Sequence, residues 1–164
     1  ISINGAANFM FDSDGLKFHG DTAAANALDD YEEGTWTAVI QSFTGTNPTV
    51  VYGNQISTYT KIGNTVCLRC EMDISTFSGG TSHLAIRGLP FHSTAGSGGN
   101  TGSFTSTSWA WTRARSQLNF INPQALGFLG QAPVTGNGTW AWEPTTLVNN
   151  SSAIRFSITY ITAA

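Results

Sequence analysis

The chain has 164 residues and a formal net charge of −3, and only 10% of its residues are charged. This length suits one domain with a substantial core, and no apolar run approaches the roughly 20 residues of a membrane span, which argues against membrane insertion. Residues 74–164 carry four scattered arginines against the single carboxylate of Glu143, a balance too weakly basic for nucleic-acid binding but suited to an anionic small ligand or glycan.

The first residues look extended rather than globular. The turn sequence DSDG separates Phe9–Phe11 from Leu16–Phe18, and the alanine-rich segment Thr22–Leu28 allows one or two helical turns. The chain begins with Ile1, and no basic start followed by an apolar stretch resembles a signal peptide. We therefore expect a piece of a longer polypeptide whose first residues have no core of their own.

A hairpin is predicted after the strand TWTAVIQ at residues 35–41. The runs QISTYTKI and TVCLRCEMDI flank Gly63-Asn64, and glycine at the first central position is typical of a two-residue hairpin turn. In this register Ile62 faces Thr65, Tyr59 faces Leu68 and Ser57 faces Cys70. Tyr59 and Leu68 would then share the core side.

Cys67 and Cys70 form a C-x-x-C pattern, which has a redox or metal interpretation and a strand interpretation. Apolar residues alternate from Val66 to Ile74 with polar ones, which favours a strand. Residues three apart on a strand point to opposite sides with Cα atoms about 10 Å apart, beyond disulfide range, and no second cysteine pair completes a zinc site. We expect two free thiols, with Cys70 in the core.

The remaining chain reads as short strands separated by turns. Alternation predicts strands at residues 82–91, 104–112, 116–122, 125–130 and 153–161, the last with Ile154, Phe156, Ile158 and Tyr160 on one face. Glycine- and serine-rich residues 76–82 and 91–103 are predicted to be exposed loops. The sequence thus predicts an all-β fold, an antiparallel, jelly-roll-like β-sandwich at residues 29–164 behind a short extended stem and junction at residues 1–28.

Three segments resemble a known group of proteins: FMFDSDGLKFHGDTAAANALDDYEEGTWTAVI, STYTKIGNTVCLRCEMDI and AIRGLPF. They are similar to the distal, C-terminal part of bacteriophage tail fibres and tailspikes, in which an ALDDYEEGTWTP-like signature joins a fibre stem to a β-structured terminal domain. Ala38 stands where that group commonly has proline. The resemblance covers about residues 9–92 and implies a homotrimer on the virion, made in the host cytoplasm. Residues 93–164 match no known pattern, as would suit a part that varies with host.

The sequence gives little support for catalysis. The carboxylate pairs are Asp29 with Asp30, Glu32 with Glu33, and Glu71 with Asp73; a glycosidase needs two such groups, but a solvated junction turn and a solvated strand face explain these better. His19, His83 and His92 are isolated, and neither a nucleophile elbow nor a zinc motif accompanies them. Asp12, Asp14 and Asp21 lack the remaining ligands of a calcium loop. We expect no enzyme, cofactor or metal in this piece; a depolymerase could lie upstream.

Two Trp-Ala-Trp sequences are candidates for ligand binding. On an extended strand Trp109, Trp111, Arg113 and Arg115 would stand in one row on one face, and Trp140 and Trp142 would form a second. Indole faces bind the apolar faces of sugars, and arginine donates forked hydrogen bonds. Alternatively, the tryptophans face the core or a subunit interface, because aromatic side chains carry large apolar areas inward.

These observations leave two classes of function. The favoured one is a trimeric fibre tip that attaches to host surface polysaccharide, lipopolysaccharide or capsule, through the six carbohydrate-binding candidates named above. The alternatives are a trimerisation or folding cap without receptor contact, and a carbohydrate-binding module that accompanies an upstream depolymerase.

Overall fold

The computed structural model describes residues 2–3, 6–7, 9–18, 23, 28, 30–94, 101–110, 114–131 and 140–163. Apart from a 3-10 turn at Thr145–Leu147, the regular structure in these ranges is β-strand. The all-β prediction is therefore confirmed.

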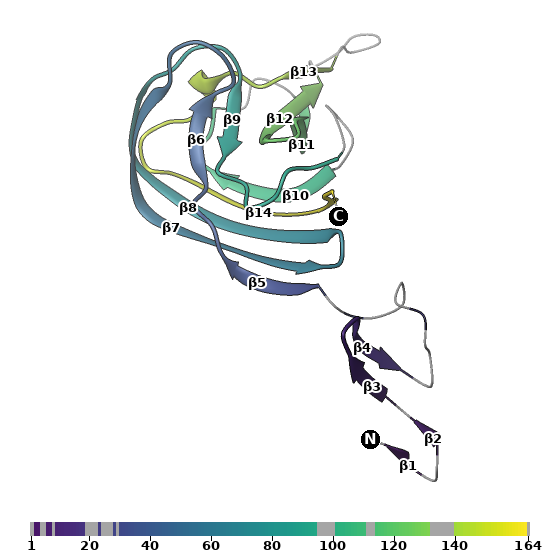
Figure 1. Ribbon diagram of the computed structural model, residues 1–164. Coiled ribbons are helices and arrows are strands. Elements are labelled where there is room, and N and C mark those ends of the chain that lie inside the picture. The colour runs from purple at the N-terminus through teal and green to yellow at the C-terminus, as the bar shows by residue number, and fades with distance from the viewer. Residues whose placement is uncertain are drawn as a thin grey trace.

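The N-terminal residues form two small hairpins that lie apart from the large sheet (Figure 1). They pair β1 (Ser2–Ile3) with β2 (Ala6–Ala7), and β3 (Phe9–Asp12) with β4 (Gly15–Phe18). The predicted DSDG turn is confirmed, since Asp12 pairs with Gly15 across it. Of the predicted helical segment Thr22–Leu28, only Ala23 and Leu28 are described, so that prediction lies outside the described residues. The division at residue 28 stays a prediction.

The other ten strands form one antiparallel sheet in the order β5-β7-β8-β14-β10-β11-β12-β9-β6, with β13 paired to β12. Their bounds are β5 Tyr31–Thr35, β6 Val39–Ser42, β7 Pro48–Ile62, β8 Thr65–Gly79, β9 Leu84–Arg87, β10 Thr101–Thr107, β11 Ala114–Asn122, β12 Ala125–Gln131, β13 Trp140–Trp142 and β14 Ser152–Ile161.

The longest strands are β7 and β8, and they form the predicted hairpin. Ile62 pairs with Thr65, Tyr59 with Leu68 and Ser57 with Cys70, which confirms the register. Gly63 has φ +56° and Asn64 is not among the positive-φ residues, so the turn has glycine at its first central position, as predicted. Both strands run 15 residues, about 50 Å at 3.3 Å per residue.

The sheet curls into a half-barrel around one core (Figure 1). The sheet bends at β10, because Thr101 and Gly102 pair with β11 while Ser103 to Thr107 pair with β14. One strand thus hydrogen-bonds both halves, so the predicted separation into two sandwiched sheets is not confirmed. The inner faces of the strands supply the core, including all four predicted residues of β14.

The predicted strand at residues 35–41 is wrong in one respect. It is broken at Trp36–Ala38, and the two parts, β5 and β6, lie at opposite edges of the sheet. Trp36 and Ala38 are buried at this crossing, so burial of their side chains compensates for the interrupted ladder. The acidic segment before Trp36 is an edge strand rather than a junction turn, because Tyr31 to Thr35 pair with β7.

The predicted cysteine placement is confirmed. Both thiols are free, with Cys70 buried and Cys67 exposed on opposite sides of β8. Burial raises the pKa of the Cys70 thiol to about 11, because an apolar environment disfavours the thiolate.

Candidate functional site

The first predicted tryptophan row, which begins at Trp109, does not start within a strand. β10 ends at Thr107, and Ser108 has φ +61°, which interrupts the extended run. Trp109 is only 8% exposed and packs edge-on against Phe128, with ring centroids 5.2 Å apart. For Trp109 the core alternative is therefore the correct one.

The other members of the predicted rows are described only in part. Trp111 and Arg113 lie outside the described residues, and Arg115 and Trp140 are described only through the backbone of β11 and β13. Trp142 is half-buried against a small cluster formed by Ala85, Ile121 and Ala125. The structure does not bring the two rows together among the described side chains, and carbohydrate binding by these residues stays a prediction.

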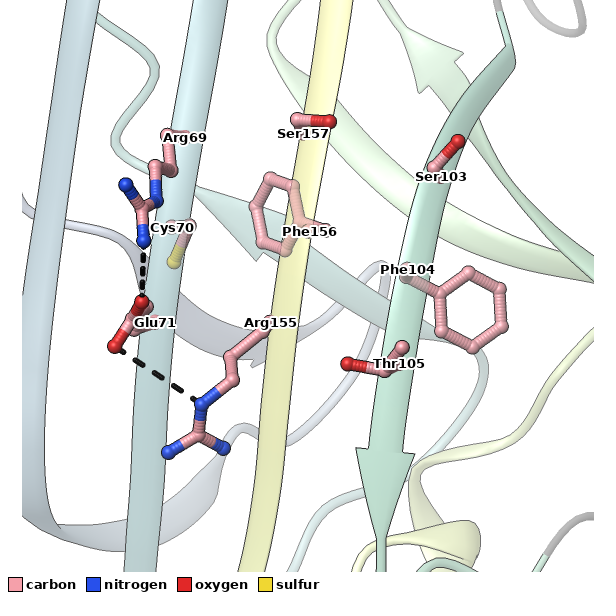
Figure 2. A pocket seen from close by; sticks show the side chains of 9 residues that line it. All are labelled: Arg69, Cys70, Glu71, Ser103, Phe104, Thr105, Arg155, Phe156 and Ser157. Carbon is pink, nitrogen blue, oxygen red and sulfur yellow. Dashed lines mark hydrogen bonds and ion pairs between the residues drawn. The ribbon is translucent and has the colours of Figure 1, made fainter.

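The outer face of the sheet holds a depression that the sequence did not predict. On this face Ser103, Ser157 and Arg69 are cross-strand neighbours, and Thr105, Arg155 and Glu71 form the next row. We call this site the outer depression; it has a volume of about 430 Å³ and spans β8, β14 and β10 (Figure 2). Phe104 and Phe156, which pack with the core, also line it.

A chain of ion pairs crosses the outer depression. Arg69 Nη2 donates to Glu71 Oε1 at 2.8 Å, and Arg155 Nε lies 4.0 Å from Glu71 Oε2 (Figure 2). Arg155 Nη2 also donates to Asp73 Oδ1 at 3.0 Å. The two arginines and two carboxylates cancel in charge, and all four are partly or largely exposed. Such exposed pairs contribute little to stability, so the cluster is available for recognition.

A second feature lies at the end of the sheet nearest the stem. Tyr31 pairs with Ile62, Ile62 with Thr65, and Thr65 with Ile161, so the exposed side chains of Tyr31, Ile62 and Ile161 form one row across the sheet. We call them the stem-end row. The described chain exposes nine large apolar side chains, and seven belong to the stem or to this row: Met10, Phe11, Phe18, Leu28, Tyr31, Ile62 and Ile161. Their concentration at one end is typical of an interaction surface.

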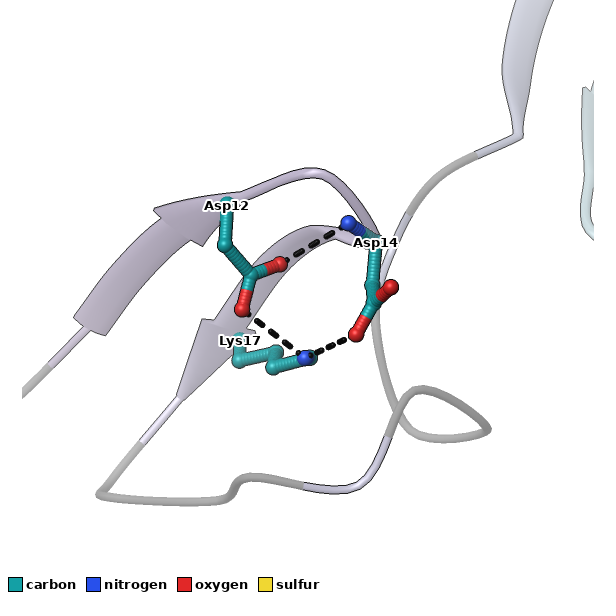
Figure 3. A network of polar contacts seen from close by, with 3 residues as sticks. All are labelled: Asp12, Asp14 and Lys17. Carbon is teal, nitrogen blue, oxygen red and sulfur yellow. Dashed lines mark hydrogen bonds and ion pairs between the residues drawn. The ribbon is translucent and has the colours of Figure 1, made fainter.

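The charges of the stem and junction are paired within the chain. Lys17 Nζ donates to Asp12 at 2.9 Å and to Asp14 at 2.6 Å (Figure 3). Hydrogen bonds to Asp14 and Asp12 raise the pKa of Lys17, and the bond from Lys17 lowers the pKa of Asp12. Lys61 binds Asp30 and lies 3.5 Å from Glu32, and its bond to Asp30 raises its pKa. Of the carboxylates considered above for calcium and for catalysis, Asp12, Asp14, Asp30 and Glu32 are thus partners of lysines.

Among the described residues, no three His, Cys, Asp or Glu side chains gather as metal ligands would. In the same part of the chain, the search for a helix with the length and hydropathy of a membrane span found none.

Comparison with known proteins finds a similar solved structure. No protein-family model matches the sequence, and no curated protein does. The crystal structure of the Dettilon tailspike protein is similar over 84% of this chain, with a TM-score of 0.59 and 18% sequence identity. The match covers 25% of that tailspike, so this chain spans about a quarter of its length. The chain therefore has the fold of a portion of a phage tailspike.

Proposed function

We propose that this chain is the distal part of a phage tail fibre or tailspike, that it assembles as a homotrimer on the virion, and that it attaches to host surface polysaccharide. The observation that carries the proposal is the agreement between two independent likenesses. The sequence resemblance covers residues 9–92, whereas the structural likeness to a tailspike extends over 84% of the chain.

The distribution of exposed apolar side chains supports assembly. Phe11 is 74% exposed in the β3–β4 hairpin, and a two-stranded hairpin with an exposed apolar face is marginally stable alone. Lys17 of this hairpin and Lys61 of β7 are both paired with carboxylates within the chain, so a partner gains little from contacts with these charges. Identical copies around one axis would cover the stem and the stem-end row together.

The cap without receptor contact is the second candidate. The burial of Trp109 favours it, because one of the six predicted carbohydrate-binding residues belongs to the core. A depolymerase, if one exists, would belong to an upstream part of the polypeptide.

Light scattering of the isolated domain tests assembly. Ile62 and Val51 are both 52% exposed, but only Ile62 belongs to the stem-end row. We expect a trimer that Ile62→Ser weakens by about tenfold in dissociation constant, because apolar contact area is lost, and that Val51→Ser leaves unchanged. A wild-type protein that stays monomeric at micromolar concentration would remove the support for assembly.

Cell binding tests attachment. The trimer should bind host cells and fail to bind mutants that lack surface polysaccharide. Equal binding to both strains, or to neither, contradicts the attachment role and leaves the cap.

A further inference from the structure

We propose that the outer depression is a binding site for a neutral, hydroxyl-rich sugar. This inference rests on the proposed attachment function and names the site and the class of ligand.

The site combines donors and acceptors within two adjacent rows. Ser103 and Ser157 stand beside Arg69, and Thr105 stands beside Arg155. A guanidinium carries five N–H donors, and the described hydrogen bonds use one from Arg69 and one from Arg155. Hydroxyls both donate and accept, and carboxylate oxygens accept. A sugar hydroxyl, itself donor and acceptor, can therefore find hydrogen-bond partners in both rows.

Charge balance decides which sugar fits. Each arginine that lines the depression is paired with a carboxylate, Arg69 with Glu71 and Arg155 with Asp73. A uronic or sialic carboxylate would have to compete with these carboxylates and would meet their repulsion. A neutral sugar uses the same donors and acceptors without that cost, so the anionic glycan expected from the overall excess of arginine is not the ligand for this site.

The site is expected to bind weakly in each subunit. Phe156 is buried and Phe104 packs on Phe128 with ring centroids 5.1 Å apart, so both rings serve the core and cannot stack on a sugar. Recognition through exposed hydrogen bonds is modest because each bond replaces one to water. Three identical sites on one trimer would raise the overall avidity.

The site lies away from the proposed contact between copies. Arg69 and Ser157 lie four residues along β8 and β14 from Thr65 and Ile161, at the stem-end row. Four residues of extended strand span about 13 Å. Copies in contact at the stem-end row therefore need not cover the outer depression.

Cys67 provides a reporter for the experiment. It is exposed on the same face as Arg69, two residues away on β8, about 7 Å at 3.3 Å per residue. The Cys70 thiol is buried with a pKa of about 11, so it stays protonated and unreactive at neutral pH. An environment-sensitive maleimide should label Cys67 alone in the intact trimer.

The labelled trimer is screened against a panel of neutral and uronic-acid-containing oligosaccharides, at low and high salt. We expect saturable fluorescence changes with neutral members, independent of salt. Arg155→Met should weaken binding by about tenfold or more, and Thr105→Val by about fivefold. Thr107→Val is the matched control: Thr107 is exposed on β10 but does not line the depression, and this substitution should leave the dissociation constant unchanged.

The contrary outcomes separate this inference from the attachment function. If only the uronic-acid-containing oligosaccharides bind, and their binding depends strongly on salt, the ligand is not a neutral sugar and the proposal is overturned. Cell binding that survives both Arg155→Met and Thr105→Val places recognition elsewhere while attachment stands. A Cys67 that resists labelling in the native trimer shows that another copy covers this face, which also refutes the site. Failure of the wild-type trimer to bind host cells refutes the attachment function itself.

Discussion

Replacing Trp109 with alanine separates a core tryptophan from a ligand-binding one. Trp109 is 8% exposed, belongs to the main core cluster and packs edge-on against Phe128. A buried tryptophan truncated to alanine costs about 3 to 5 kcal/mol, through lost transfer free energy and the cavity that remains. A domain of ordinary stability has about 5 to 15 kcal/mol in total, so Trp109→Ala should remove a large fraction of it.

Urea unfolding followed by circular dichroism measures this cost. A loss of 3 to 5 kcal/mol corresponds to a fall in melting temperature of about 6 to 20 °C for a chain of this size. Trp142→Ala is the control, because Trp142 is half-buried against the smaller cluster around Ile121 and should cost less. Trp109→Ala protein that unfolds like the wild type but no longer binds host cells would refute the core assignment and restore Trp109 as a ligand-binding residue.

Two further predictions concern pH and backbone geometry. The folded pKa of Cys70, about 11, lies above its unfolded value of 9.0, so the contribution of the protonated thiol to the free energy of unfolding is complete below pH 9 and is lost as the pH rises toward 11, by about 2 to 3 kcal/mol at most. In Cys70→Ala the free energy of unfolding should depend less on pH over this range. A wild-type free energy of unfolding that does not fall between pH 9 and pH 11 contradicts the burial of Cys70. Gly88 has φ +85°, and an added Cβ would lie 2.0 Å from the Thr37 carbonyl oxygen. Gly88→Ala should therefore destabilise the fold by more than about 1 kcal/mol, and by more than Gly63→Ala, whose added Cβ meets nothing within 4 Å; equal unfolding midpoints for the two variants would contradict the close approach.

The elements that could be predicted are those specified by neighbouring residues. The β7–β8 hairpin follows from Gly63-Asn64 and from alternation on both sides of it, and the pairing of Tyr59 with Leu68 came out as expected. The inward face of β14 and the burial of Cys70 follow from the same period of two. A one-residue slip in register would expose the whole apolar set, so the alternation allows few other strand registers.

Alternation alone could not determine where an extended run stops. The residues around Trp109 and around Trp36 both read as continuous strands, yet the left-handed Ser108 ends one, and the crossing at Trp36–Ala38 breaks the other. Both breaks bury a tryptophan. The gain from burying so large a side chain outweighs a few ladder hydrogen bonds, and that balance depends on tertiary neighbours.

The sequence by itself determined the class of fold, the central hairpin, the free thiols and the resemblance to phage fibres, because each rests on adjacent residues. Only the tertiary structure decided the curl at β10, the stem-end row and the outer depression. Arg69 and Glu71 lie on β8, and Arg155, more than 80 residues further along the chain, lies on β14; they meet through the register of these two strands. That register is fixed by the core beneath the sheet, so the outer polar cluster is a consequence of inner packing that no local pattern specifies.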